Sequence, residues 1–202
     1  MSSVDQAPGT STMDRRAAVA RLLDARGGAL VVTGLGSPSY DVHAAGDRDD
    51  NYYLWGAMGA AALVGLGLAQ AQPERRVMVI TGDGEQLMAF GALATIAVAR
   101  PRNLDVIVLD NEHFGETGMQ GSHTGRGIDL AAVAAAAGFA EAGLLRSLSE
   151  VDDLCARLAT TGEGPRLHVL KVHAENLPRS LPPRDAVFVK NRFRAQLGLE
   201  PS

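Results

Sequence analysis

Short apolar runs alternate along this chain with segments whose apolar residues recur at helical spacing. Two of the runs are uninterrupted, Val77-Met78-Val79-Ile80 and Val106-Ile107-Val108-Leu109. Continuous apolar runs bounded by turn residues are typical of strands buried on both faces of a parallel sheet. The same pattern predicts strands at 29–33, 76–81, 104–109, 139–142 and 167–172, and helices after Asp14 and Asp129 and at 56–72, 86–99, 149–160 and 184–197.

This alternation predicts an α/β domain with a doubly wound, mostly parallel sheet flanked by helices. The length of 202 residues is enough for one sizeable core. We expect a disordered polar leader at 1–13, the folded domain at 14–177, and a C-terminal arm and helix at 178–202. The polar segments 41–51 and 112–127 are predicted as loops, and a loop as long as the second is usually functional.

Composition narrows the classes of partner. The chain is 46% hydrophobic and 21% charged, with a net charge of −4 and no basic stripe, which argues against nucleic-acid binding. The single cysteine, Cys155, excludes an intrachain disulfide and fits a reducing cytoplasm. The most apolar stretch, 56–71, is broken by glycines and is short for a membrane span. We therefore expect a cytoplasmic protein that binds neither nucleic acid nor membrane.

Oxygen-bearing side chains stand at the ends of the two uninterrupted apolar runs. Gly82-Asp83-Gly84 follows the first run, and Asp110-Asn111 follows the second. The 26 residues of 85–110 form a crossover, which places both strand ends at one edge of the sheet. Open α/β sheets bind ligands at that edge. Asp83 and Asn111 offer the hard oxygens that Mg²⁺ prefers, and the glycines let the backbone approach phosphate.

A second glycine-rich turn invites a different interpretation. Gly34-Leu35-Gly36-Ser37-Pro38-Ser39 follows the first predicted strand, as a dinucleotide-binding turn would. The third glycine of that fingerprint is replaced by Ser39, and Pro38 stands where the next helix should begin. A non-catalytic nucleotide-binding module therefore stays as the alternative from another functional class.

Three segments together resemble the thiamine diphosphate-dependent enzymes. The Gly-Asp-Gly triplet followed one crossover later by Asn111 is similar to their cofactor-binding motif. Leu54-Trp55-Gly56-Ala57-Met58-Gly59 is similar to the turn before a long helix in the pyrophosphate domain of the decarboxylase branch. The loop 111–124 is similar to that of sulfopyruvate and phosphonopyruvate decarboxylases, where Thr-Gly-x-Gln is followed by Thr. The resemblance covers about 30–172 and implies that 14–177 is a pyrophosphate domain.

The resemblance implies thiamine diphosphate and Mg²⁺ as cofactors. By position, Asp83 and Asn111 would bind Mg²⁺ through their side chains, and His113 through its backbone carbonyl. Gly82 and Gly84 would lie against the diphosphate, with the N–H of Gly84 donating to it at the start of a helix.

Glu85 departs from the family pattern, because relatives commonly carry a small residue such as Ser after the triplet. A carboxylate beside a diphosphate is repelled unless it points away. We therefore expect the Glu85 side chain to point outward and only its backbone N–H to serve the cofactor.

Met58 is implied to be an apolar wedge beneath the cofactor, which keeps its two rings in a bent conformation. Gly56 and Met58 would also contact the pyrimidine ring through their backbones. The alternative is that Met58 only fills the core.

Four residues of the long loop are candidates for substrate contact. Thr117, Gln120 and Thr124 either contact substrate or only order the loop. His123 either binds an anionic substrate and relays protons or is a solvated loop histidine. The resemblance suggests a substrate with a sulfonate or phosphonate tail, and Arg126 is the only cation that the loop itself supplies.

The family's chemistry also needs a glutamate that activates the pyrimidine ring, and a separate pyrimidine-binding domain supplies it. This chain has room for one α/β unit, so we expect a separately encoded partner subunit, assembled as a heterodimer or heterotetramer. The implied reaction is decarboxylation of a small 2-oxo acid. Carboligation, as in acetolactate synthase relatives, is the enzymatic alternative.

Overall fold

The computed structural model describes residues 12–200, and within that range its centre is a six-stranded sheet. The strand order is β2-β1-β3-β4-β8-β7, and every neighbouring pair is parallel. The predicted doubly wound α/β fold is confirmed. The strands of this sheet are β1 (Leu30–Thr33), β2 (Asn51–Tyr53), β3 (Val77–Gly82), β4 (Leu104–Asp110), β7 (Glu141–Leu145) and β8 (Arg166–Lys171).

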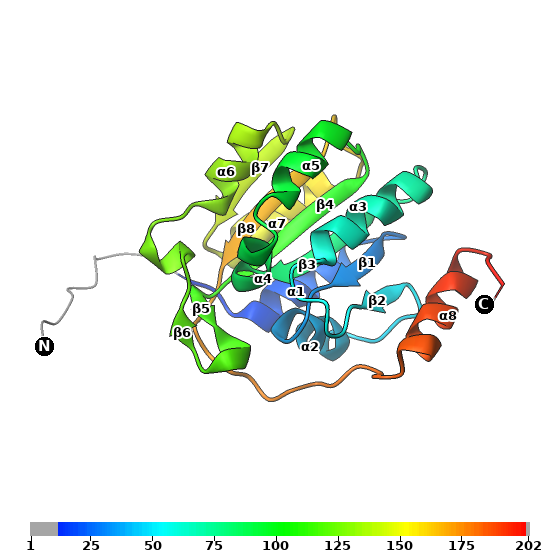
Figure 1. Cartoon of the computed structure of the whole chain (residues 1–202), viewed down its shortest axis with the longest axis horizontal. Coiled ribbons are helices and arrows are strands. Elements are labelled where there is room, and N and C mark those ends of the chain that lie inside the picture. Colours follow the sequence, from blue (N-terminus) through cyan, green and yellow to red (C-terminus); the bar gives the residue numbers. More distant parts are fainter. Residues whose placement is uncertain (1–11, 201–202) are drawn as a thin grey trace, which may run out of the picture.

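Helices cover both faces of the sheet (Figure 1). One face carries α3 (Ala61–Ala71), α5 (Ala92–Ala99) and α6 (Leu130–Ala137). The other face carries α1 (Arg15–Asp24), α2 (Ser37–Ala44) and α7 (Leu148–Leu158).

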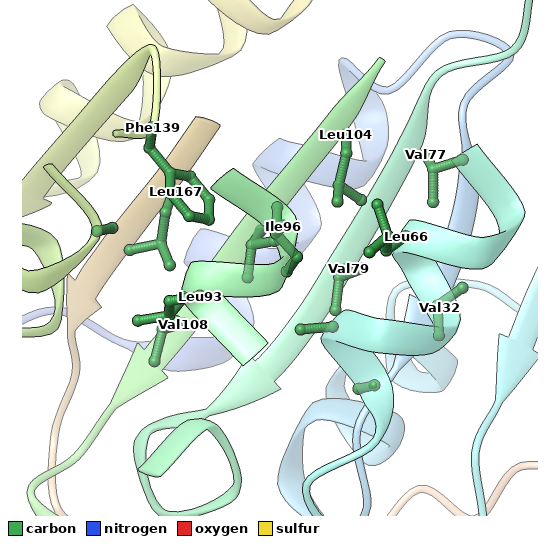
Figure 2. Packing of buried hydrophobic residues seen from close by; sticks show 14 of the residues in the cluster. Val32, Leu66, Val77, Val79, Leu93, Ile96, Leu104, Val108, Phe139 and Leu167 are labelled. Carbon is green, nitrogen blue, oxygen red and sulfur yellow. The ribbon is translucent and has the colours of Figure 1, made fainter. Parts of the chain in front are cut away.

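Two apolar layers result, because successive strand residues point to opposite faces. Figure 2 shows the layer under α3 and α5, where Leu66, Leu93 and Ile96 pack toward Val79 and Leu104. The second layer joins α1 and α7 to the other face of the same strands; it includes Leu22, Met78, Ile80, Ile107 and Leu154. Burial on both faces explains why the central strands are continuous apolar runs.

Two predicted helices are shorter than expected. The helix predicted at 56–72 begins only at Ala61, because Gly56 (φ 71°) and Gly59 (φ 93°) hold the preceding residues in a turn. The helix predicted at 86–99 is two helices, α4 (Asp83–Met88) and α5. The backbone leaves helical geometry at Ala89 (φ −108°, ψ 43°).

The polar segment 41–51, predicted as a loop, holds the end of α2 and the first residue of β2. Pro38 lies in the first turn of α2, where the missing N–H has no helical partner to lose. Contrary to the expectation from the sequence, Pro38 is therefore compatible with the start of a helix at this position. Asp41 is buried in α2 because Arg15 and Arg16 neutralise it.

Most of the predicted leader, 1–11, lies outside the described residues. Its last residue, Met13, is buried and forms a parallel bridge with Val172, so this position belongs to the fold. None of the helices within residues 12–200 is long and apolar enough to cross a membrane.

The C-terminal arm runs from the end of β8 past the carboxyl ends of the strands to α8 (Ala186–Gln196), which packs beside β2 (Figure 1). The indole N–H of Trp55 donates to the carbonyl of Pro183 at 2.9 Å. The ring of Phe193 meets Tyr52 edge-on, with ring centroids 5.4 Å apart. The arm is thus bound to the domain by specific contacts.

Candidate active site

The two residues predicted as metal ligands through their side chains, Asp83 and Asn111, line one cavity at the carboxyl edge of the sheet. β3 and β4 are neighbours, with Gly82 opposite Leu109, so Asp83 and Asn111 follow adjacent strand ends. The cavity is partly open to solvent. The antiparallel hairpin of β5 (His113–Phe114) and β6 (Gln120–Gly121) lies at the same end of the domain (Figure 1), and both residues of β5 line the cavity.

The glycine triplet forms the turn from β3 into α4. Gly82 is the N-cap residue and has no side chain to cap the helix, and Gly82, Asp83 and Gly84 all line the cavity. A Cβ on Gly84 would lie 2.7 Å from the ring of Phe114, so only glycine fits there. This turn can present backbone N–H groups to an anion.

Asp83 is a buried carboxylate, 2% exposed, and two loop hydroxyls hold one of its oxygens. Ser122 and Thr124 both donate to Oδ2 of Asp83, the latter at 3.1 Å. Burial, and then the nearby charge of Asp110, raise the pKa of Asp83 to about 6. A carboxylate destabilised in this way favours a cation beside it.

A second buried acid, Asp110, lies beside Asp83 and is neutralised by Lys171. The Lys171 ammonium donates to Asp110 at 2.8 Å and to Glu112 at 2.6 Å. Thr124 links the two acids, because its hydroxyl also approaches Asp110 at 2.8 Å. Sequence reasoning gave no role to Asp110 or Lys171. They are the last residues of β4 and β8, and the pairing of these strands puts them opposite each other.

Asn111 and His113 form a tight turn after β4. Oδ1 of Asn111 accepts the backbone N–H of His113 at 3.0 Å, and Nδ1 of His113 lies 2.8 Å from the Asn111 carbonyl. Glu112 between them has a φ of 62°, in the left-handed region. The turn holds the Asn111 amide at the cavity, while the role of the His113 carbonyl stays a prediction.

Met58 lies at the cavity rather than in the core. Its side chain is 38% exposed and lines the cavity. The interpretation of Met58 as core filler is therefore wrong. The glycines at 56 and 59 shape the turn that carries it, and the predicted backbone contact of Gly56 stays a prediction.

The expectation for Glu85 was wrong, because its side chain points inward and is only 7% exposed. Its carboxylate accepts the Thr81 hydroxyl at 2.9 Å and the backbone N–H of Gly59 at 3.2 Å. These donors offset part of the desolvation that raises the pKa of Glu85. The sequence did not show the contact with Gly59, because Gly59 is distant from Glu85 along the chain.

The loop candidates separate into two groups. Thr124 is buried and bound to the two acids, so it orders the loop around them. Thr117 and Gln120 are exposed and bond to each other, through a side-chain contact of 3.1 Å and a side chain-to-backbone contact of 2.9 Å. Of these two, Thr117 lines the cavity. His123 is exposed, and its ring meets Phe114 edge-on.

Sequence reasoning missed two contributions to the cavity. Leu35, from the turn between β1 and α2, lines it together with Ser37 and Pro38 at the start of α2. Arg15 of α1 lines it as well, held by the buried carboxylate of Asp41. No local motif indicated Arg15, since it lies far along the chain from the other cavity residues.

The sequence of the chain was compared with models of protein families and with known proteins. The model of the C-terminal TPP-binding domain of thiamine pyrophosphate enzymes matches residues 39–172. A phosphonopyruvate decarboxylase of Streptomyces viridochromogenes is 40% identical over 194 residues, covering 93% of this chain and 47% of that protein. Sulfopyruvate decarboxylase subunit beta of Methanothermobacter thermautotrophicus is 35% identical over 181 residues, covering 90% of this chain and 94% of that subunit.

The chain thus spans about half the length of the phosphonopyruvate decarboxylases that it matches. Among solved structures, benzoylformate decarboxylase from Polynucleobacter necessarius has a TM-score of 0.66 at 18% identity, covering 87% of this chain and 36% of that one. At that identity the likeness concerns the fold.

Proposed function

Because the chain belongs to the thiamine pyrophosphate enzyme family, we propose that it is the pyrophosphate- and Mg²⁺-binding subunit of a 2-oxo acid decarboxylase. One observation carries the proposal. Asp83 and Asn111, at the ends of adjacent strands, line a single cavity together with the open first turn of α4.

The residues at this edge fit the cofactor. Asp83 and Asn111 would hold Mg²⁺ by their side-chain oxygens, with the His113 carbonyl beside them, and the first-turn amides of α4 would hold the diphosphate. Within residues 12–200 no three His, Cys, Asp or Glu side chains form a metal cluster. Mg²⁺ commonly binds through one or two protein carboxylates plus phosphate oxygens.

Thiamine diphosphate, when bound, supplies the electron sink for loss of carbon dioxide from a 2-oxo acid. The chain's own part is geometric and electrostatic. Met58 supports the cofactor from the turn before α3, and Ser122 and Thr124 keep the Asp83 carboxylate in place.

A partner subunit completes the proposed enzyme. The archaeal relative that this chain covers almost completely is named as a beta subunit. We propose a separately encoded subunit that carries the pyrimidine-binding domain and the activating glutamate, in a heterodimer or heterotetramer. The cytoplasmic location suggested by the lone Cys155 stays a prediction.

Sulfopyruvate or phosphonopyruvate is the proposed substrate. Both carry an anionic tail, and the cavity wall includes Arg15, whose guanidinium is paired with Asp41. The guanidinium of Arg179, in the C-terminal arm, lies 3.3 Å from the carboxylate of Glu116, which also lines the cavity. These cations supplement Arg126, which was the only one visible in the loop sequence.

The test is to co-purify the chain with its partner and titrate the complex with thiamine diphosphate and Mg²⁺ by calorimetry, with NAD as control. Saturable Mg²⁺-dependent binding supports the proposal; binding of NAD alone would instead favour the nucleotide-binding module. Carbon dioxide and aldehyde in equal amounts from sulfopyruvate or phosphonopyruvate identify decarboxylation. A carboligated product would point to the acetolactate synthase-like alternative.

A further inference from the structure

The Glu85 carboxylate is enclosed by three chain segments that are distant in sequence. Its Oε2 accepts the hydroxyl of Thr81, at the end of β3, and its Oε1 accepts the N–H of Gly59, before α3. The backbone amides of Leu35 and Ala61 also favour its charged form. One side chain thus connects β3 with the turns before α2 and before α3.

The packing around the carboxylate leaves no spare room. A Cβ added to Gly34 would lie 1.7 Å from Oε2 of Glu85. A Cβ added to Gly59 would lie 3.4 Å from Cβ of Met88, and Gly59 already has a positive φ of 93°. The absence of a side chain at Gly34 therefore leaves the space that the carboxylate occupies, whereas glycine at 59 is favoured by its backbone conformation.

The turn that carries Met58 is closed by a backbone hydrogen bond from the N–H of Ala60 to the carbonyl of Ala57 at 3.1 Å, and the Glu85 carboxylate ties it to α4. Met58 itself is 38% exposed, so its own packing fixes it weakly. The N-cap position of α3 is Ala60, which has no side chain that can cap the helix. The Glu85 carboxylate takes the role of that missing cap, because it accepts the N–H of Gly59 and lies by the N–H of Ala61. Its negative charge is stabilised by the positive end of the α3 dipole.

We propose that Glu85 is a positioning residue, whose buried carboxylate fixes the turn 56–60 and thereby sets where Met58 projects into the cavity. The inference rests on the proposed function in one respect, the role of Met58 as the support of the cofactor. The contact itself, between the carboxylate and the Gly59 amide, is independent of any ligand.

The primary test is hydrogen–deuterium exchange of the ligand-free chain, comparing wild type with Glu85→Gln. The neutral amide keeps the size of the side chain but directs an NH₂ group at a backbone donor. We expect the exchange rates of the Gly59 and Ala61 amides to rise about tenfold or more, because the variant loses a hydrogen bond to a charged group. Unchanged protection there would overturn the inference whether or not thiamine diphosphate binds.

Two further variants separate positioning from general stability. Thr81→Val removes a donor to the same carboxylate but leaves the Gly59 contact, so exchange at Gly59 should stay near the wild-type rate. Gly34→Ala displaces the carboxylate without altering it, so it should reproduce the Glu85→Gln effect even if that variant folds poorly. Equal exchange increases in all three variants would indicate a merely structural role.

The second test uses the complex with its partner and a double-mutant cycle. Glu85→Gln should lower kcat in the wild-type background and have little effect in a Met58→Ala background, because it acts through Met58. Equal losses in both backgrounds would contradict the inference. If the wild-type complex does not bind thiamine diphosphate, the proposed function fails while the exchange result still decides the role of Glu85 in the turn.

Discussion

At the carboxyl ends of β3 and β4, polar side chains are buried and bound to one another, whereas on the β5–β6 hairpin they lie in solvent. Asp83 and Asp110 are each 2% exposed and share the Thr124 hydroxyl. Thr117 and Gln120 are exposed and bond mainly to each other. The two regions border the same cavity but are stabilised by different means.

The difference indicates a division of labour. Buried acids near each other are costly unless a cation or hydrogen bonds compensate them, so such a cluster persists where it serves binding. An exposed hairpin costs little to alter, and its side chains can change with the substrate. We therefore expect changes at the strand ends to affect cofactor binding and stability, and changes on the hairpin to affect substrate use.

The largest effect is expected from Asp83→Ala. Loss of this carboxylate should abolish Mg²⁺-dependent binding of thiamine diphosphate, measured by calorimetry on the complex. Asp129→Ala is the control, because Asp129 caps α6 and should cost only about 1 kcal/mol of stability. Unchanged cofactor affinity in Asp83→Ala would remove the strand ends from the site.

Lys171→Met should be the most destabilising of the neighbouring changes. It leaves the buried carboxylate of Asp110, and the exposed carboxylate of Glu112, without their shared cation. The expected cost is about 3–5 kcal/mol in the free energy of unfolding, most of it from Asp110. Arg102→Met breaks the exposed pair with Glu163 and should cost less than about 1 kcal/mol. Urea denaturation of both variants measures the contrast, and similar costs would contradict it.

The pH dependence of the metal-free chain should reveal Asp83. Folding raises its pKa to about 6, above that of the unfolded chain, so folding favours the protonated carboxyl. The free energy of unfolding should therefore fall by up to about 3 kcal/mol as the pH rises from 4 through 6. Asp83→Asn should lose this dependence, and identical pH profiles for the two proteins would show that Asp83 is not perturbed.

The smallest effect is expected from Gln120→Ala on the hairpin. The exposed side chain loses only its contacts with Thr117, so the free energy of unfolding should change by less than about 0.5 kcal/mol. Cofactor affinity should stay unchanged, while KM for the 2-oxo acid reports any contact with substrate. A large loss of cofactor affinity would contradict the division between the two regions.

Element boundaries show where local patterns were insufficient. The central strands were predictable because burial on both faces leaves an uninterrupted apolar run. The break between α4 and α5 was not, because its one sequence mark is Gly91, and a single glycine inside a helical pattern does not by itself predict a break. The short strand β2 was hidden in a polar segment, since it lies at the edge of the sheet.

By itself, the sequence determined the fold class, the two strand ends with Asp83 and Asn111, and the family of cofactor. The fold class follows from the alternation of strands and helices, the two strand ends follow from residues within one crossover, and the cofactor follows from the resemblance of three segments to a known family. Only the tertiary structure decided that Glu85 points inward, that Lys171 neutralises Asp110, and that Arg15 reaches the cavity. The physical reason is that a side chain's direction depends on donors and charges brought to it from distant segments, which no local pattern records.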